Sequence, residues 1–548
     1  MRYLSKVASI VCTAAVAISL SGCGGGSSAT APAATPPAPA PEGTPCPIPP
    51  SVQEQNIALN QDSTRIIFDV ASGAEETNFS IFEFLSREYG YGHTPDSKGI
   101  ANISFDKKDV VQKRVVSIIA DAKELKTKAP SRDMEDITGD NLACDEGTYS
   151  LHYSIGGGGG EEDGVYKDWS ERDFLASFDN CVLYEGSDKW EQLEDVVEYV
   201  LFGTSLVARM RYMTEEDGVF TINGSSKLLI RDEYAESDNY EDGDNFYEES
   251  FKNTYNMNIE IENTNLSMDY TINQNQLFTF QSNGKINVDF GIEDNGYQRE
   301  DREEDDNLTQ KDINGNHKFN VSIKTSMDVE ELMREGEIDD YDMITFQAYC
   351  YSFNFDGTEE EIDYRHEIED EDGNVTVDDQ RNTKTESLDT LANGYVAVNM
   401  TGTEYDGLYQ MFFDLYQDGF DINYQRIGKS VDNETTHIDD RNETFSINGV
   451  IGSTMIGGSV GFVTLDPWES SNHFDTDRED LEEASDLYPH RTPYKGMISV
   501  SSLNQAMVGF DYEYNEAIDE NVTYGYIQID DNAPVEYDSI YDMLYDFH

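Results

Sequence analysis

The pattern of apolar and polar residues changes near residue 136, and from there to the C-terminus it repeats every two positions. Apolar side chains occupy alternate positions in segments 257–261, 286–290 and 319–323, with Asn, Asp, Glu or Ser between them. Alternate residues of a strand face opposite sides of a sheet, so this pattern predicts half-buried antiparallel strands. The pattern predicts a mainly β body over residues 136–548, formed by one or more extended antiparallel sheets built of hairpins.

Short polar motifs ending in glycine divide this body. They are Asp217-Gly218, Asn223-Gly224, Asn283-Gly284, Asn393-Gly394, Asp418-Gly419 and Asn448-Gly449. Such dipeptides favour two-residue hairpin turns, because those turns require positive φ. The clearest predicted hairpin runs from Tyr409 to Tyr424 and turns at Asp418-Gly419.

Four strongly acidic stretches are expected to be surface loops between the strands. They are Asp232–Ser250, Glu293–Asp306, Thr358–Asp379 and His473–Asp486.

One motif occurs twice. Phe220-Thr221-Ile222-Asn223-Gly224 matches Phe445-Ser446-Ile447-Asn448-Gly449. The repeat suggests a duplicated strand unit that stacks into one long sheet. Chance similarity within a strand-rich chain is the alternative.

Residues 51–135 have helical rather than strand periodicity. Residues Ala58–Ser63 lead into Ile66, Ile67 and Val70, as at the start of a capped helix, and further helices are expected at Ile81–Glu88 and after Asp106. The stretch Asp106–Arg132 holds eight basic and four acidic residues. We expect this basic helix to dock on the acidic body of the protein, with a position on a membrane surface as the alternative.

The first residues have the pattern of an export signal. Arg2 and Lys6 precede an apolar run from Val7 to Leu20, too short to cross a bilayer of about 30 Å as a helix. The run ends in Leu20-Ser21-Gly22-Cys23, which resembles the lipobox of bacterial lipoproteins, with an ordinary secretory signal as the alternative.

The resemblance implies that residues 1–22 are removed and that Cys23 carries acyl chains such as palmitate. Gly24, in place of the Asp that marks inner-membrane retention in that family, implies the outer membrane. Residues 23–50 then form a Pro- and Ala-rich tether between the lipid and the body.

The chain is extremely acidic, with a formal net charge of −72. Such a field repels the phosphates of nucleic acid and anionic lipid headgroups, so a nucleic-acid partner is not expected. Solvation in salty surroundings is the simplest account of the charge. The alternative is binding of calcium or of a cationic partner.

Four cysteines remain once Cys12 leaves with the signal and Cys23 is acylated, and four cysteines allow three pairings. The segments 144–150 and 178–181 resemble a paired Cys-x-x-Gly and Phe-x-Asn-Cys pattern of β-rich acidic outer-membrane lipoproteins of Gram-negative bacteria. The segment around Tyr488, Pro489 and Gly496 is similar to theirs as well. The resemblance implies a Cys144–Cys181 disulfide, which leaves Cys46 and Cys350 as the remaining pair.

Other motifs yield no catalytic residue. Gly457-Gly458-Ser459-Val460-Gly461 has the spacing of a nucleophile elbow, but a strand rather than a helix is expected after Ser459. The run Gly156–Gly160 leads into Glu161 and Glu162, which repel phosphate, so a flexible loop is expected there. The histidines lack zinc-binding spacing.

Calcium candidates are carboxylates in the acidic stretches, although these lack the glycine and glutamate of an EF-hand loop. They are Asp238, Asp242, Asp244, Asp370 and Asp372. No other cofactor is expected.

These features predict an outer-membrane-anchored lipoprotein with a non-enzymatic binding or scaffolding role and a protein or polysaccharide partner at the cell envelope. One alternative is a secreted polymer hydrolase at the cell surface, with two buried carboxylates in a groove lined by Trp169, Trp190 or Trp468. The other is a calcium-dependent adhesin. The oligomeric state does not follow from the sequence.

Overall fold

A computed structural model provides the structure of the chain. It describes residues 46–68, 70–71, 138–162, 164–190, 193, 218–243, 246–272, 275–302, 309–337, 340–369, 375–404, 407–433, 436–477, 493–515, 520–537 and 543. The signal, Cys23 and most of the tether therefore lie outside the described residues, as do the predicted helices at 81–88 and 106–132.

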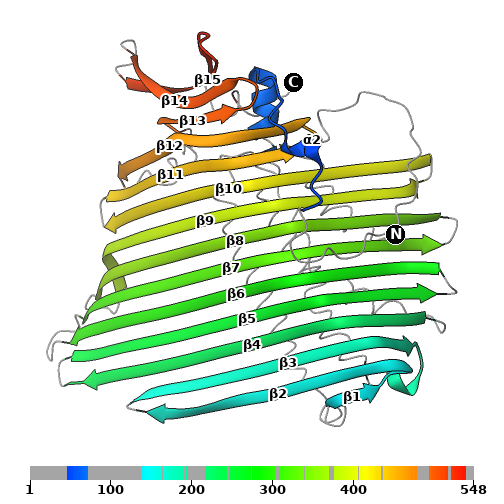
Figure 1. Ribbon diagram of the computed structural model, residues 1–548. Helices are drawn as coiled ribbons and strands as arrows, with labels where there is room; N and C mark the ends of the chain where they lie inside the picture. Colours follow the sequence, from blue (N-terminus) through cyan, green and yellow to red (C-terminus); the bar gives the residue numbers. More distant parts are fainter. Residues whose placement is uncertain are drawn as a thin grey trace.

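Sixteen strands form a single antiparallel sheet in which the spatial order follows the chain order (Figure 1). The strands are β1 (Gly139–Ala143), β2 (Glu146–Glu162), β3 (Val165–Tyr184), β4 (Gly218–Asp242), β5 (Phe246–Ile272), β6 (Asn275–Arg302), β7 (Thr309–Glu337), β8 (Asp340–Glu369), β9 (Val375–Glu404), β10 (Gly407–Asn433), β11 (Thr436–Ser453), β12 (Gly458–Asp477), β13 (Lys495–Ser501), β14 (Gln505–Asn515), β15 (Glu520–Ile529) and β16 (Val535–Tyr537). The predicted mainly β antiparallel fold is confirmed.

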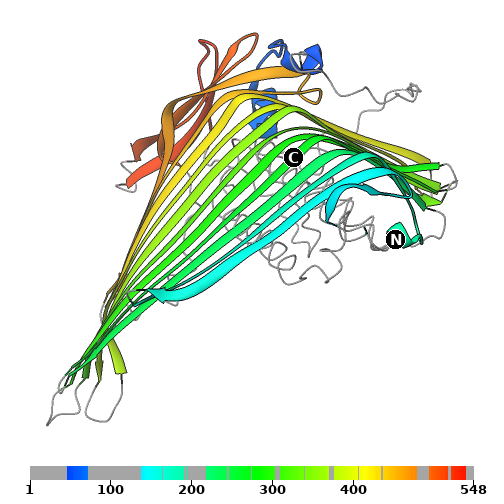
Figure 2. The ribbon, with the colours of Figure 1, turned by 60° about the horizontal axis from the view of Figure 1, so that its bottom comes forward.

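The central strands are very long. β8 and β9 each contain 30 residues, which corresponds to about 100 Å at roughly 3.3 Å per residue. The sheet curves along these strands instead of lying flat (Figure 2). Among the described residues, no helix is long and apolar enough to cross a membrane.

Five of the six Asn-Gly and Asp-Gly motifs are not hairpin turns, which corrects the prediction; Asp217 of the sixth lies outside the described residues. Except for Gly218, which begins β4, they lie inside strands, and Tyr409–Tyr424 belongs to the single strand β10. The register shifts beside them, as between Asn223 and Ser225. Such β-bulges bend a strand, so a line of bulges across the sheet accounts for its curvature.

The Asn residues of four of these motifs, and Asp328 of β7, each cap a backbone N–H of a neighbouring strand, generally at a bulge. The side-chain oxygens of Asn223, Asn283, Asp328, Asn393 and Asn448 accept hydrogen bonds from the backbone N–H groups of Asn180, Asn265, Cys350, Gly419 and Thr464, at 2.7, 3.3, 2.6, 2.7 and 2.9 Å respectively. The caps satisfy donors that the shifted ladder leaves unpaired. We call this line of motifs the bulge seam.

The two copies of the repeated motif occupy equivalent positions on the bulge seam. Gly224 has φ +88° and Gly449 has φ +92°. A Cβ at either position would lie 2.1 Å from the carbonyl oxygen of Asn265 or 2.0 Å from that of Gly419. In both copies the motif places a glycine where φ is positive and a neighbouring carbonyl lies too close for a side chain. Duplication of a larger unit stays a prediction.

The acidic stretches are largely the outer ends of strands, not loops. Asp232–Asp242 belongs to β4, Glu293–Arg302 to β6, Thr358–Glu369 to β8 and His473–Asp477 to β12. Polar side chains two residues apart lie on the same face and pair there: the Tyr234 hydroxyl donates to Glu236 at 2.8 Å, and that of Tyr247 to Glu249 at 2.9 Å.

One face of the sheet, which we call the core face, carries the apolar rows. A first cluster spans β2 to β9, with Ile259, Val288, Ile323 and Phe355 almost fully buried. A second covers β10 to β15 and includes the helix at residues 61–68. The predicted capped helix is confirmed, because the Asn60 side chain accepts from the Ser63 N–H at 2.9 Å. Its Phe68 ring lies 5.6 Å from that of Phe462.

Residues 46–60, the N-terminal strap, cross from the outer face to the core face. The strap begins at a Cys46–Cys350 disulfide on β8, and Val52 of α2 (Pro50–Gln53) packs on Tyr395 of the outer face. The Glu54 carbonyl then accepts from Ser459 N–H at 2.9 Å, and the Ile57 carbonyl from Leu503 N–H at 3.1 Å. β11 pairs with β10 only from Tyr416 onward, and α2 lies at the step that results (Figure 1).

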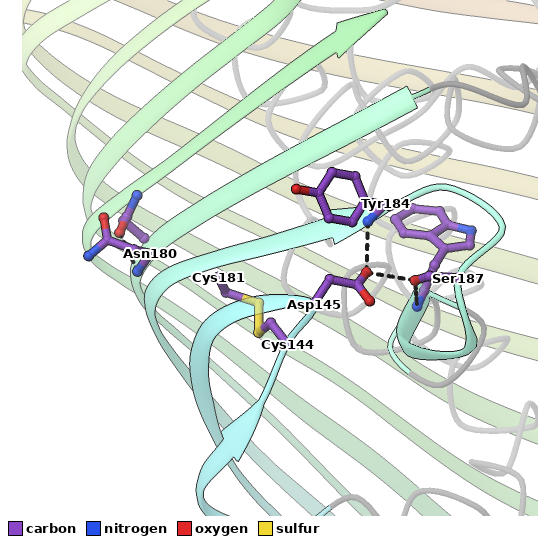
Figure 3. The surroundings of a disulfide bond; sticks show 8 residues. Cys144, Asp145, Asn180, Cys181, Tyr184 and Ser187 are labelled. Atoms are coloured by element: carbon purple, nitrogen blue, oxygen red, sulfur yellow. Dashed lines mark hydrogen bonds between the residues drawn. A yellow bond between two sulfur atoms is a disulfide. The ribbon is translucent and has the colours of Figure 1, made fainter.

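The second disulfide joins Cys144 and Cys181, as the resemblance implied (Figure 3). Beside it, Asp145 accepts hydrogen bonds from Tyr184 N–H at 2.9 Å and from the Ser187 hydroxyl at 2.6 Å. Both remaining cysteine pairs are therefore bonded.

Two glycine-rich motifs also have clear places. Gly156–Gly160 is part of β2 and pairs with Lys167–Glu171 of β3, which corrects the expected loop. Ser459 is the second residue of β12, which continues as the expected strand. It is fully buried, and its hydroxyl donates to the Gln53 carbonyl at 2.9 Å. The geometry is that of a packed strand, without the strand-to-helix turn of a nucleophile elbow.

Candidate binding surface on the core face

The core face changes from apolar to charged along the length of the central strands. The row Ile259–Val288–Ile323–Phe355 is entirely apolar, and the next contains Met257, Phe290 and Val321. One row further out, Tyr255, Ile292 and Phe319 lead across the sheet to Glu359, Glu386, Arg426 and Glu443. On the core face, the apolar rows are therefore directly followed by a row that contains charged side chains.

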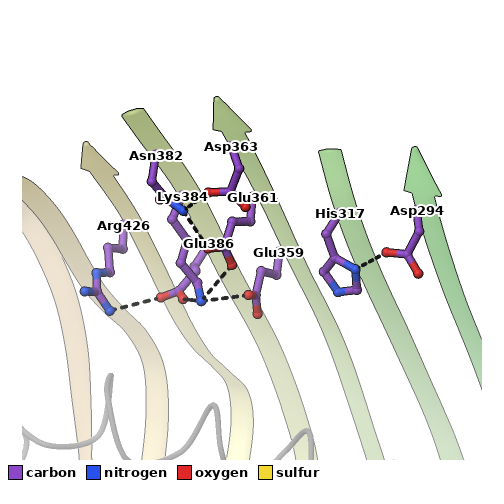
Figure 4. Close-up of polar contacts among 9 residues, drawn as sticks. All are labelled: Asp294, His317, Glu359, Glu361, Asp363, Asn382, Lys384, Glu386 and Arg426. Atoms are coloured by element: carbon purple, nitrogen blue, oxygen red, sulfur yellow. Dashed lines mark hydrogen bonds and ion pairs between the residues drawn. The ribbon is translucent and has the colours of Figure 1, made fainter. Parts of the chain in front are cut away.

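Lys384 is at the centre of these charges. Its Nζ lies 2.8 Å from a Glu359 carboxylate oxygen and 3.6 Å from those of both Glu361 and Glu386 (Figure 4). Residue Glu359 is only 7% exposed. A carboxylate at such a position requires a partner, because burial of an unpaired charge costs several kcal/mol, on the order of 3–5.

Arg426 continues the network toward β11. Its Nη1 lies 3.4 Å from Glu386 Oε2, and its Nε 3.9 Å from Glu443 Oε1. The Ser470 hydroxyl donates to Glu443 at 3.1 Å. Glu359, Glu361, Lys384, Glu386, Arg426 and Glu443 together form what we call the carboxylate network.

Beyond the network the same face becomes more open. Asn382 donates to Glu361 at 2.6 Å and also to Asp363, and His317 is hydrogen-bonded to Asp294 (Figure 4). Glu361 is partly exposed and Asp363 is exposed. Four glutamates and Asp363 accompany two cations here, so the surface carries an excess of negative charge that faces solvent at its outer end.

Tyr255 lies at the margin of this surface, and burial raises the pKa of its phenol. The Tyr255 phenol borders the charged rows, and burial, with Asp232 nearby, raises its pKa. The phenol therefore stays protonated at neutral pH. Cations gathered by the carboxylates would meet an apolar and aromatic border on one side and solvent on the other.

The opposite, outer face is charged in a more dispersed way. Lys252 pairs with Glu293 at 2.7 Å and Lys318 with Glu360 at 3.0 Å, all of them substantially exposed. Exposed pairs of this kind contribute little, about 0–1 kcal/mol. Burial and the neighbouring carboxylates of Asp421 and Asp356 raise the pKa of Asp389 on this face.

The two calcium candidates that the structure describes do not lie together. Asp238 and Asp242 are four residues apart on β4, a separation of about 13 Å along a strand. Asp244, Asp370 and Asp372 lie outside the described residues. Within the described part of the chain, no group of three or more His, Cys, Asp or Glu side chains has the arrangement of a metal site.

The three tryptophans lie apart. Trp169 is 47% exposed on β3, whereas Trp468 is buried against Phe68 and Phe510. Trp190 stacks on Phe220 at 4.8 Å. The hydrolase alternative, a groove lined by any one of them together with two buried carboxylates, stays a prediction.

The carboxylate network was not predicted from the sequence. Glu359 and Glu361 fall in a stretch that was interpreted as an acidic loop, Thr358–Asp379, and Arg426 and Glu443 lie on strands distant in sequence, β10 and β11. The signal was present, because Glu359, Glu361 and Asp363 alternate with the same period of two as the apolar residues before them.

Comparison with known proteins found no family model that matches this chain. No curated protein matches it either.

Proposed function

We propose that this protein is an outer-membrane-anchored lipoprotein that binds a cationic partner at the cell envelope, and that its role is non-enzymatic. The lipobox-like segment ending at Cys23 supports the anchor. Two disulfides support export to an oxidising compartment, where such bonds form and persist.

The observation that carries the proposal is the attachment of the N-terminal strap. Cys46 is bonded to Cys350, about a third of the way along β8, a strand near the middle of the sheet. A pull transmitted from a lipid on Cys23 would reach the sheet through this covalent bond, so the terminal strands would bear none of it. Such a connection suits a body that must stay folded while anchored.

The core face supports the binding role. The carboxylate network and the exposed Asp363 present an excess of negative charge on long, closely paired strands. A rigid surface loses little conformational entropy when it binds. A basic protein segment or an amine-bearing polysaccharide has the matching chemistry.

Membrane fractionation of cells that carry Cys23→Ser tests the anchor. The native chain is expected in the outer-membrane fraction and the variant in the soluble fraction; a variant that stays with the membrane contradicts the proposal. Binding of a fluorescent nine-residue oligolysine to the purified chain, near physiological ionic strength, tests the second part. No binding there contradicts it.

A further inference from the structure

The first long strand of the sheet has an open edge. β1 pairs with β2 only through residues up to Leu151. Residues His152–Glu162 of β2 continue beyond it, which is about 35 Å of strand, and among the described residues they pair only with β3. Every second residue of such an edge directs its N–H and C=O away from the sheet.

Over residues 153–160 this edge lacks the usual protection against strand pairing. Proteins normally shield a long edge with proline, bulges or charged side chains. Here residues 156–160 are all glycine, and the register with β3 runs without a shift from Thr148 to Glu162. Residues 157–162 are exposed. An incoming strand could therefore approach the backbone closely.

Two aromatic side chains of β3 lie next to the glycines, one on each face. Trp169 covers one face, because a Cβ at Gly156 would lie 3.2 Å and one at Gly158 3.5 Å from its ring. Tyr166 lies toward the other face, with its hydroxyl 3.3 Å from a Cβ placed at Gly159. Trp169 is 47% and Tyr166 45% exposed. Side chains of an added strand would reach over the glycines to both rings.

The geometry points to the β2 edge, residues 152–162, as a site that takes up an extended segment of a partner protein as a seventeenth strand. Main-chain hydrogen bonds give the affinity in this mode, and alternate side chains give the specificity. The segment carries large apolar or aromatic residues over the glycines. It carries Lys or Arg opposite Glu161 and Glu162, which are both exposed.

A second copy of the chain fits this edge less well. Antiparallel self-pairing would set glycine against glycine, leaving Trp169 and Tyr166 uncovered, and would bring together two bodies of formal charge −72. The inference goes beyond the proposed function and uses none of the carboxylate network, so either can fail alone.

The probe is a fluorescent twelve-residue peptide that begins with two lysines and continues with Val and Tyr alternating with Thr. Its binding to the full chain in detergent is followed by anisotropy up to about 1 mM peptide, the range of weak but specific complexes. Hydrogen exchange of those amides of residues 152–162 that point away from β3 is measured in parallel. We expect these amides to exchange rapidly in the free chain and to be protected by the peptide.

Three variants sharpen the test. Trp169→Ala is expected to weaken binding about fivefold, the scale of a cross-strand aromatic pair, whereas Tyr240→Ala, at an aromatic 78% exposed on β4, leaves binding unchanged. Combined Glu161→Lys and Glu162→Lys also weakens it. The same peptide N-methylated at alternate residues on its pairing edge should not bind.

The inference is overturned if the peptide does not bind, or if the N-methylated form binds equally well. It is also overturned if the edge amides are already protected in the free chain. In that case the molecular mass in solution shows whether a second copy or the chain itself covers the edge.

Discussion

The bulge seam makes a quantitative prediction at Gly224. Replacing this glycine by alanine forces an L residue to adopt φ near +88°, which costs about 1–2 kcal/mol. The new Cβ would also lie 2.1 Å from the Asn265 carbonyl oxygen, so β4 and β5 must shift apart locally. With the loss of ladder hydrogen bonds that follows, we expect the free energy of unfolding to fall by about 3 kcal/mol.

Gly428 provides the matched control. It lies in β10, has no positive φ, and a Cβ there would be 3.8 Å from the nearest atom, the Lys384 carbonyl oxygen. Gly428→Ala should be neutral or stabilising by about 0.5–1 kcal/mol, because glycine is unfavourable inside a strand. Both variants replace a strand glycine by alanine. They differ in the φ angle at that glycine and in how close the new Cβ lies to the neighbouring backbone.

The assay is urea unfolding followed by far-ultraviolet circular dichroism, with unfolding midpoints compared at equal slope. Gly224→Ala should unfold at clearly lower urea than the native chain, and Gly428→Ala should not. Equal midpoints for the two variants would refute the reasoning, since they would show that the seam glycines need no special conformation.

Three further outcomes follow from the structure. Lys384→Met should lower the free energy of unfolding by about 1–2 kcal/mol in thermal melts, because it weakens the ion pairs of Glu359 and Glu386. The control Lys285→Met, which removes an exposed ion pair with Glu262, should cost under about 0.5 kcal/mol. Equal losses would contradict the claim that the buried pairs contribute more than the exposed one. Asp389→Asn should raise the melting temperature at pH 7 and leave it unchanged near pH 3. The raised pKa of Asp389 means that its ionised form is unfavourable in the folded chain, and this penalty is absent below the pKa of the unfolded state. A gain of the same size at both pH values would contradict this prediction. Replacing both Cys46 and Cys350 by alanine should cost about 6 kcal/mol, and replacing Cys144 and Cys181 about 4 kcal/mol, because the bonds span 304 and 37 residues. The opposite order in urea unfolding would show that loop closure is not the main contribution.

Local pattern predicted the strands but not where they end. The period of two around Ile259, Val288 and Ile323 follows from the pleat of the strand, which directs alternate side chains to opposite faces. It can therefore be read from the sequence alone. Asn-Gly is ambiguous, because positive φ serves both a hairpin turn and a bulge inside a strand. The apolar alternation continues on both sides of Asn223-Gly224 and Asn448-Gly449, and this continuity distinguishes a bulge from a turn.

The acidic strand ends were misjudged for a different reason. The acidic composition of residues 358–369 suggests a loop, yet these residues continue β8. Their carboxylates form ion pairs and a hydrogen bond with side chains on adjacent strands, namely Lys384, Lys318 and Asn382. Such partners are 21 to 42 residues away in sequence, and only the register brings them together. The same dependence on register kept the carboxylate network out of the sequence prediction. The Cys144–Cys181 bond was predicted through resemblance to a known pattern, and spacing alone left the pairing open.

The most direct test of the binding role compares two double variants that remove the same charge from opposite faces. Glu361→Gln with Asp363→Asn neutralises the open end of the core face, and Asp356→Asn with Asp389→Asn neutralises exposed acids of the outer face. The dissociation constant of the nine-residue oligolysine is measured for each at about 0.15 M salt, where charges further apart than roughly 8 Å are screened. We expect a severalfold weaker complex for the core-face variant alone. Equal affinities for the two variants would contradict the account, because binding would then follow total charge and not this surface.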